Sequence, residues 1–270
     1  MCVIWGVPYL LIKVAVRDLT PASLVFLRTG LGALFLLPLA VTRGQLRPLV
    51  PYWRPLLAYT VAELAIPWFL LSAAERRLSS SLSGLLVAAV PLVGAVFGRL
   101  AGDHEPLGVR RLTGLLVGLG GVAALVGLDL GAISLVALLE VAVVIVGYAL
   151  GPLILSRTLS HLPGLGVVAA SLGLTAVIYA PLGILQLPRQ LPNGRVIASV
   201  VVLATLCTGV AFLIFFRLIA EVGPVRATVI TYVNPAVAVG LGVTFLHERF
   251  TVGIAVGFVL VLAGSVLATR

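Results

Sequence analysis

Charged side chains are scarce in this chain of 270 residues. Only 10% of the residues are Asp, Glu, Lys or Arg, 61% are hydrophobic, and the mean hydropathy is +1.21. A soluble domain carries roughly 25% charged residues and about half apolar ones. Because a globule of this size cannot hide so much apolar surface in its own core, a soluble fold is excluded. The solvent around most of the chain must therefore be lipid.

Cysteine, histidine and lysine are also rare, which removes several classes of site. The two cysteines, Cys2 and Cys207, are too few for a disulfide framework, and the three histidines fall at the ends of apolar segments, so we expect no metal site and no cofactor. The single lysine, Lys13, follows Ile12, whereas a phosphate-binding loop needs Gly-Lys. The net charge of +9 comes from arginines without interleaved aromatics, so nucleic acid is not an expected partner.

What the chain does contain is a series of long apolar stretches. No charged residue lies between Arg77 and Arg99, or between Arg195 and Arg217. A helix needs roughly 20 apolar residues to cross a bilayer, and the polar/apolar alternation of a membrane barrel is absent. We expect an all-α integral membrane protein with about ten transmembrane helices, at residues 3–16, 22–41, 55–74, 80–99, 109–128, 132–155, 163–186, 196–219, 226–246 and 251–269. The first is short, as it would be if the start were truncated or placed late.

One pattern of proline, glutamate and glycine occurs twice. Pro91 precedes Glu105 by 14 residues, and Pro235 precedes Glu248 by 13. Glycines then follow each Glu at offsets of 9 and 16 residues, at Gly114 and Gly121 and at Gly257 and Gly264. We therefore divide the chain into two repeats, residues 1–130 and 131–270. Each repeat has an odd number of helices, so the second must enter the membrane from the opposite side. Two inverted five-helix repeats have two near-equivalent packings, which predicts alternating access.

These residues resemble the EamA family of the drug/metabolite transporter superfamily. The stretches that carry the likeness are AVPLVGAVFGRLAGDHEPLGVRRLTGLLVGLGG, YVNPAVAVGLGVTFLHERF and, near the start, Trp5-Gly6, Tyr9, Lys13 and Arg28. The resemblance covers essentially the whole chain. It implies ten helices, a central substrate cavity, and efflux or uptake of small metabolites. Pro106 departs from the family pattern, which usually has Arg there, whereas the second repeat keeps His247-Glu248-Arg249.

Two acidic residues lie deep in apolar segments. Glu63 falls near the middle of the third segment, and Glu140 lies inside the sixth. An acid in the membrane is costly and usually faces a cavity or a partner. We expect Glu63 and Glu140 to line the substrate cavity, where a carboxylate couples transport to protons or binds a cation. The alternative is a packing bond to a neighbouring helix. Pro67 leaves the Glu63 carbonyl without its helical partner, which favours a cation beside Glu63. We expect Glu105 and Glu248, in contrast, to mark helix ends.

Aromatic and basic residues share one stripe of the first segment. Trp5, Tyr9 and Lys13 recur at intervals of four residues, so they lie along one helix face. They would either form a cavity wall that stacks a planar substrate or an organic cation, or form an interfacial belt with Lys13 reaching outward. Further cavity candidates are Arg28, Trp68, Tyr148 and Tyr232.

Prolines and glycines predict where helices bend and touch. Pro91, Pro152 and Pro235 lie inside the fourth, sixth and ninth segments and free backbone carbonyls there, either as hinges at substrate contacts or as static kinks. Asn234 stands beside the last of these breaks. Two G-x-x-x-G pairs, Gly114 with Gly118 and Gly253 with Gly257, predict close helix packing within the chain or in a homodimer.

Three functions fit a chain of this kind: a secondary transporter, an intramembrane enzyme acting on a lipid-linked substrate, and a non-transporting scaffold. An enzyme would need convergent acids and histidines, and a scaffold would not need matched helix breaks, so we expect a transporter and not an enzyme. We predict an exporter of small metabolites such as amino acids or related organic compounds, with protons as the coupling ion. More arginines lie at the helix ends on the N-terminal side, which predicts a plasma membrane protein with both termini in the cytoplasm.

Overall fold

The computed structural model describes residues 2–102, 108–128, 134–222 and 233–269, and every regular element in these ranges is helical. Six helical stretches are long and apolar enough to cross a bilayer: Pro21–Thr42, Arg47–Ala74, Ser80–Leu100, Leu135–Leu159, Gly164–Leu185 and Gly194–Phe215. Shorter apolar helices occupy Val3–Ala15, Leu112–Ala124, Asn234–Leu246 and Val252–Gly264. Each of them overlaps one of the predicted segments, so the prediction of an all-α membrane protein is confirmed, although the stretch Arg47–Ala74 begins well before the predicted segment 55–74.

The first half of the chain supplies α1 to α7. The first two segments are α1 (Cys2–Ala15) and α2 (Pro21–Thr42). The third combines η1 (Arg47–Tyr52), α3 (Trp53–Tyr59), the π-helix η2 (Thr60–Ala65) and α4 (Ile66–Ala74). The fourth and fifth are α5 (Ser80–Val87) with α6 (Val90–Leu100), and α7 (Val109–Leu128).

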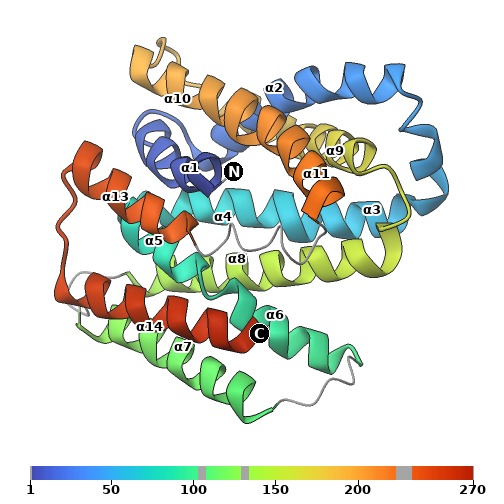
Figure 1. Cartoon of the computed structure of the whole chain (residues 1–270). Coiled ribbons are helices and arrows are strands. Elements are labelled where there is room, and N and C mark those ends of the chain that lie inside the picture. The colour runs from blue at the N-terminus through green and yellow to red at the C-terminus, as the bar shows by residue number, and fades with distance from the viewer. Residues whose placement is uncertain (1, 103–107, 129–133, 223–232, 270) are drawn as a thin grey trace.

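The second half repeats this order. Its segments are α8 (Leu135–Ile154) with the π-helix η3 (Leu155–Leu159), α9 (Gly164–Leu185), α10 (Gly194–Ala204) with the π-helix η4 (Thr205–Val210) and α11 (Ala211–Val222), α13 (Asn234–Leu246), and α14 (Val252–Thr269). In Figure 1, α3, α4 and α8 cross the middle of the molecule, with α2, α9, α10 and α11 above them and α6, α7 and α14 below.

The helices begin and end at residues whose chemistry explains the boundary. Thr20 caps α2 by accepting the main-chain N–H of Ser23, and Pro21 occupies the first turn, where its missing N–H costs nothing. Ser79 caps α5 in the same way by accepting the N–H of Leu82. α5 ends at Val87 and α6 begins at Val90, so the fourth segment is interrupted just before Pro91.

Contacts between helices show that the two halves are built alike. α2 packs on α9, α5 on α13, and α7 on α14, so helices of equal rank in the two halves pair with each other. The contact of α1 with α10 is matched, when the halves are exchanged, by that of α8 with α4. The contact of α2 with α10 is likewise matched by that of α9 with η2. This reciprocity is what a two-fold relation between the halves produces.

The halves run in opposite directions through the bundle. Lys13, in the last turn of α1, contacts the turn between α4 and α5. Glu140, in the second turn of α8, pairs with Arg77 of that same turn. The first half therefore ends its first helix where the second half begins its own. We call this the Glu75 end of the bundle. At the other end, which we call the Tyr52 end, the Tyr52 ring meets the ring of His161 at 4.7 Å.

The apolar side chains divide between the core and the outer surface. Leu36, Leu172 and Leu203 are fully buried where α2, α9 and α10 meet. Large apolar residues such as Leu34, Leu116 and Val177 remain exposed on the outer faces of α2, α7 and α9. An outer surface of this kind suits contact with lipid, where only helices with satisfied backbones are tolerated.

Candidate functional site

Arg28 is the most tightly held of the predicted cavity residues. It points from α2 into the bundle, is 8% exposed, and its guanidinium lies 3.6 Å from the centre of the Trp68 ring of α4. Its Nε donates a hydrogen bond of 3.2 Å to the hydroxyl of Thr208 in η4. A desolvated cation over an indole face is worth about 2 kcal/mol. Arg28 therefore ties the first half to the π-helix of the second.

The two long π-helices occupy matching places in the halves. η2 and η4 interrupt the third and eighth segments, and alignment of Thr60 with Thr205 places Glu63 opposite Thr208. Each π-helix is hydrogen-bonded to a polar side chain of the other half. Thr208 of η4 accepts from Arg28 of α2, and Thr60 of η2 is bonded to the Ser171 hydroxyl of α9 over 2.9 Å. π-Helical turns inside α-helices frequently mark functional sites, and no periodicity in the sequence reveals them here.

The stripe on α1 faces the interior. Tyr9 is buried and lies within electrostatic reach of Tyr148 on α8, and Tyr148 interacts with the Trp68 side chain. Trp5 packs against the rings of Phe212 and Phe215 of α11, at 5.9 and 4.7 Å between centroids. Trp5 and Tyr9 therefore pack against other helices of the bundle, and their role as a wall of the substrate cavity stays a prediction.

Lys13 binds the end of α4. Its ammonium donates to the main-chain carbonyls of Glu75 and Leu78, over 2.6 and 2.7 Å. These carbonyls belong to the turn after α4, where the helix dipole is negative and a cation is favourable. Lys13 thus joins α1 to the turn between α4 and α5.

Glu75 is a functional candidate that sequence reasoning missed. It follows α4 directly, is 0% exposed, and neither carboxyl oxygen has a hydrogen-bond partner among the residues that the structure describes. Burial raises the pKa of the Glu75 carboxyl well above its usual range, with Glu248 acting in the same direction and Lys13 and Arg28 opposing it. A position beside Arg76 and Arg77 at a segment end is typical of a surface residue, and no signal in the sequence indicates its burial.

Six side chains come together in the interior, and we call this group the polar cluster. Its members are Tyr9, Lys13, Arg28, Trp68, Glu75 and Tyr148. It combines two cations, one carboxyl and three aromatic side chains, contributed by α1, α2, α4, the turn after α4, and α8. Residues from both halves meet in it. Such a set offers aromatic faces, cations and a carboxyl group to a small amphipathic molecule.

Glu248 does more than mark a helix end. Its Oε1 accepts the main-chain N–H of Ser80 over 2.7 Å, and its Oε2 accepts that of Ser81 over 3.0 Å and both serine hydroxyls. The carboxylate thereby caps α5 from the other half of the molecule. His247 adopts a left-handed conformation (φ 55°) that closes α13 and turns the chain back. Glu105, its counterpart, lies outside the described residues.

Glu63 lies within electrostatic reach of Tyr148 of the polar cluster. It packs so closely on α8 that a Cβ at Gly151 would overlap its carboxylate, and its Oε2 is buried without a hydrogen-bond partner among the described parts of the chain. Its neighbours include the phenols of Tyr59 and Tyr148. The pair Gly147 and Gly151 permits this approach, and sequence analysis overlooked it although its G-x-x-x-G spacing was visible.

Glu140 lies outside the polar cluster and forms a packing bond to another part of the bundle, which was the alternative expectation for it. Its carboxylate forms an ion pair of 3.1 Å with Arg77, and the two side chains are 16% and 47% exposed. The partner lies 63 residues away in the sequence, so segment position alone could not reveal it. We interpret this as an interfacial pair that holds α8 against the turn after α4.

The predicted helix breaks fall mostly at the starts of helices. Pro91 and Pro235 stand in the first turns of α6 and α13, where proline is well tolerated, whereas Pro67 stands in the first turn of α4, which continues η2 without a break. Pro152 is inside α8, two residues before the helix gives way to η3. The Asn234 carbonyl lies against Gly6 of α1. Tyr232 lies outside the described residues.

The glycines of α7 and α14 pack within the chain. A Cβ at Gly264 would overlap the backbone of Gly118 and the carbonyl of Gly114, so these helices touch almost backbone to backbone. Gly253 and Gly257 are buried in α14. Packing inside one protomer accounts for Gly114 and Gly118, and the homodimer stays a prediction.

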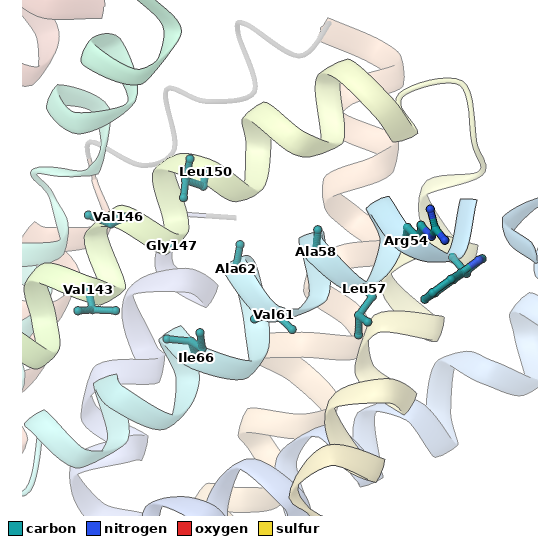
Figure 2. Close-up of a pocket in the computed structure, with 11 residues that line it drawn as sticks. Arg54, Leu57, Ala58, Val61, Ala62, Ile66, Val143, Val146, Gly147 and Leu150 are labelled. Atoms are coloured by element: carbon teal, nitrogen blue, oxygen red, sulfur yellow. The ribbon is translucent and has the colours of Figure 1, made fainter. Parts of the chain in front are cut away.

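One hollow in the described structure lies apart from the polar cluster. It is an apolar groove of about 470 Å³ between α3, η2 and α4 on one side and α8 on the other, lined by Trp53, Arg54, Leu57, Ala58, Val61, Ala62, Ile66, Val143, Val146, Gly147 and Leu150. Figure 2 shows Val143, Val146 and Leu150 of α8 opposite Ala62 and Ile66. None of the predicted cavity residues lines it. Within the described ranges, no three His, Cys, Asp or Glu side chains gather as metal ligands.

Comparison with known proteins accounts for this architecture. The sequence profile of the EamA-like transporter family matches residues 1–127 and 135–270. The chain belongs to the EamA-like transporter family. This EamA-like transporter is 24% identical to the uncharacterized transporter YvbV of Bacillus subtilis over 99% of this chain and 88% of that protein. It is 29% identical to the uncharacterized inner membrane transporter YedA of Escherichia coli K12, over 89% of this chain and 78% of YedA.

A solved crystal structure has the same fold. It superposes on this EamA-like transporter with a TM-score of 0.71 at 23% identity, covering 99% of this chain and 93% of the other. The protein is therefore a multi-pass membrane transporter made of two EamA halves. YvbV and YedA are both named as transporters, and neither name states an enzymatic activity.

Proposed function

We propose that this transporter is a secondary exporter of small amphipathic metabolites, amino acids or related organic compounds, and that it works by alternating access between its two halves. The observation that carries the proposal is the polar cluster. Arg28 and Trp68 lie in the interior and contact both halves, which is where a substrate pathway between inverted repeats would run. Aromatic faces beside cations and a carboxyl group suit a molecule with an apolar body and an ionised head.

Protons are the coupling ion in this proposal, and Glu63 is the coupling carboxyl. It is held in a π-helix, in the interior, with a carboxyl oxygen that no described donor satisfies. An ionisable group in that position changes its protonation when water enters from one side. Thr208 occupies the matching position of the other half, so only one half would carry the proton.

The orientation we propose is both termini in the cytoplasm of a cytoplasmic membrane. The Tyr52 end, where α1 begins, lies near Arg43, Arg47, Arg54 and Arg157, and an excess of arginine favours the cytoplasmic side. The name of YedA places that relative in the inner membrane, which agrees with this orientation. Export then runs from the Tyr52 end to the Glu75 end.

The test is flux in proteoliposomes against a panel of amino acids and their decarboxylated amines. If one substrate molecule is exchanged for one proton, a difference of one pH unit across the membrane should sustain a substrate concentration ratio of about tenfold. The reason is that a tenfold gradient of either species corresponds to roughly 1.4 kcal/mol. Glu63→Gln should still move substrate downhill but lose this accumulation, so its ratio stays near one.

Glu140→Gln is the matched control, because that acid lies in an ion pair outside the polar cluster. It should keep the wild-type dependence on pH. An unchanged pH profile in Glu63→Gln would remove Glu63 from the coupling step. Absence of flux for every compound of the panel in the wild-type protein would overturn the proposed substrate class.

A further inference from the structure

The Glu75 carboxyl is surrounded by ionisable groups and bonded to none of those described. Its side chain is 0% exposed, and both oxygens lack a hydrogen-bond partner within the described structure. The charged and titratable groups that face it from the packed elements are Tyr9 and Lys13 of α1, Arg28 of α2, Tyr148 of α8 and Glu248 after α13.

The cation next to Glu75 is engaged elsewhere. Lys13 donates to two main-chain carbonyls, including that of Glu75 itself, so its bonds stabilise the end of α4 and not the carboxylate. Arg28 is committed to Trp68 and Thr208. A buried carboxylate without donors costs several kcal/mol. The carboxyl therefore carries a proton in this closed arrangement, in accord with its raised pKa.

We propose that Glu75 is the binding site for the primary ammonium group of the transported compound, and that the ammonium takes the place of a proton on its carboxyl. The exchange balances in charge and atoms. The O–H bond of the carboxylic acid breaks and its proton passes to water. The two carboxylate oxygens then accept hydrogen bonds from the N–H groups of R–NH₃⁺. The inference rests on the proposed function, since it names the chemical class that the site would select.

Chemistry around Glu75 favours an ammonium over the other ligands that a carboxyl can hold. A divalent cation needs several oxygen ligands, and the described part of the chain gathers no group of three acidic, histidine or cysteine side chains. An ammonium needs three acceptors, and the negative end of α4 lies beside the carboxyl. Tyr9, Trp68 and Tyr148 supply apolar and aromatic contact for the body of an amine.

Proton release on binding is the direct readout. We would titrate the purified protein with phenethylamine in weakly buffered detergent solution containing a pH indicator, and repeat this with 2-phenylethanol as the neutral isostere. The wild-type protein should release about one proton per amine bound and none with the alcohol. Glu75→Gln should release none and bind the amine roughly tenfold or more weakly, the loss expected for a charge-assisted hydrogen bond. Glu75→Asp should restore the release.

The variants separate this site from the coupling carboxyl. Glu63→Gln should still release the proton on binding, although it loses proton-driven accumulation. The inference is overturned if Glu75→Gln still releases a proton on binding. It is also overturned if the wild-type protein binds phenethylamine without releasing a proton, or does not bind it. Flux of the panel compounds without such release would leave the proposed function standing and remove only this site.

The pH dependence of stability gives a second readout that does not depend on a ligand. In the folded protein the pKa of the Glu75 carboxyl is raised above its ordinary value of 4.5, so the folded state keeps this proton at a pH where the unfolded chain loses it. The contribution of Glu75 to stability is therefore fully present below pH 4.5. This contribution is lost as the pH rises through the raised pKa. The apparent melting temperature of the wild-type protein should fall over that range, and Glu75→Gln should flatten the fall. An equal slope in both proteins contradicts a protonated Glu75. A cooperative melting transition in Glu75→Gln shows that misfolding does not explain its loss of binding.

Discussion

Arg28 shows how one residue can serve both stability and a substrate pathway. Its guanidinium lies 3.6 Å from the centre of the Trp68 ring while its Nε donates to the Thr208 hydroxyl, and a lysine ammonium cannot reproduce both contacts in this arrangement. We predict that Arg28→Lys lowers the free energy of unfolding by about 2 kcal/mol, measured by denaturation in detergent. Arg189→Lys, at an exposed loop position, should change it by less than about 0.5 kcal/mol. Equal effects would show that the stacked geometry is unimportant.

For single residues, the sequence predicted positions that follow from local spacing and missed those that depend on contacts with distant parts of the chain. The spacing of Trp5, Tyr9 and Lys13 was enough to place them on one face, and the face proved to be interior. The ion pair of Glu140 and the burial of Glu75 are features that local pattern does not show. The carboxylate of the first is paired by an arginine 63 residues away, and that of the second is buried by helices that arrive from elsewhere in the chain.

The helices themselves follow from the sequence more closely than their irregularities do. Apolar length determines the segments, and prolines mark the starts of α4, α6 and α13. The π-helices η2 and η4 could not be predicted, because their extra residue per turn depends on packing against α8, α9 and α2. The glycine pattern predicted close packing, and the structure adds that Gly264 is the point of closest contact.

A glycine comparison tests the packing of α7 on α14. Gly264→Ala places a Cβ into the backbone of Gly118, whereas a Cβ at Gly240 of α13 meets nothing within 4 Å. We predict that Gly264→Ala destabilises the protein by about 1–3 kcal/mol through overpacking. Gly240→Ala should be neutral or stabilise by up to about 1 kcal/mol, since alanine favours the helix. Thermal unfolding in detergent measures both, and a neutral Gly264→Ala would contradict the close contact.

The whole molecule is two opposed halves closed at one end. Glu248 of the second half caps α5 of the first, beside Glu75 and within electrostatic reach of Lys13. The odd number of helices in each half was sufficient to predict the inversion. The closure was not predictable, because it depends on the left-handed turn at His247 and on the space left by Gly242. Transport by alternating access requires this contact to open.

A reversible cross-link at this closure tests the central claim, that substrate passes between the halves by alternating access. A Cβ at Gly242 of α13 would lie 2.9 Å from the Ser80 hydroxyl of α5, so cysteines at these two positions are within reach of a disulfide, whose Cβ atoms lie about 3.5–4.5 Å apart. The same Cβ would overlap the Glu248 carboxylate and the Ser81 hydroxyl, so the reduced double variant must first match the flux of the wild-type protein. In a background lacking Cys2 and Cys207, oxidation of Ser80→Cys with Gly242→Cys should abolish flux in proteoliposomes, and reduction should restore it. Each single variant should be indifferent to oxidation. Undiminished flux through the fully cross-linked protein would contradict the account.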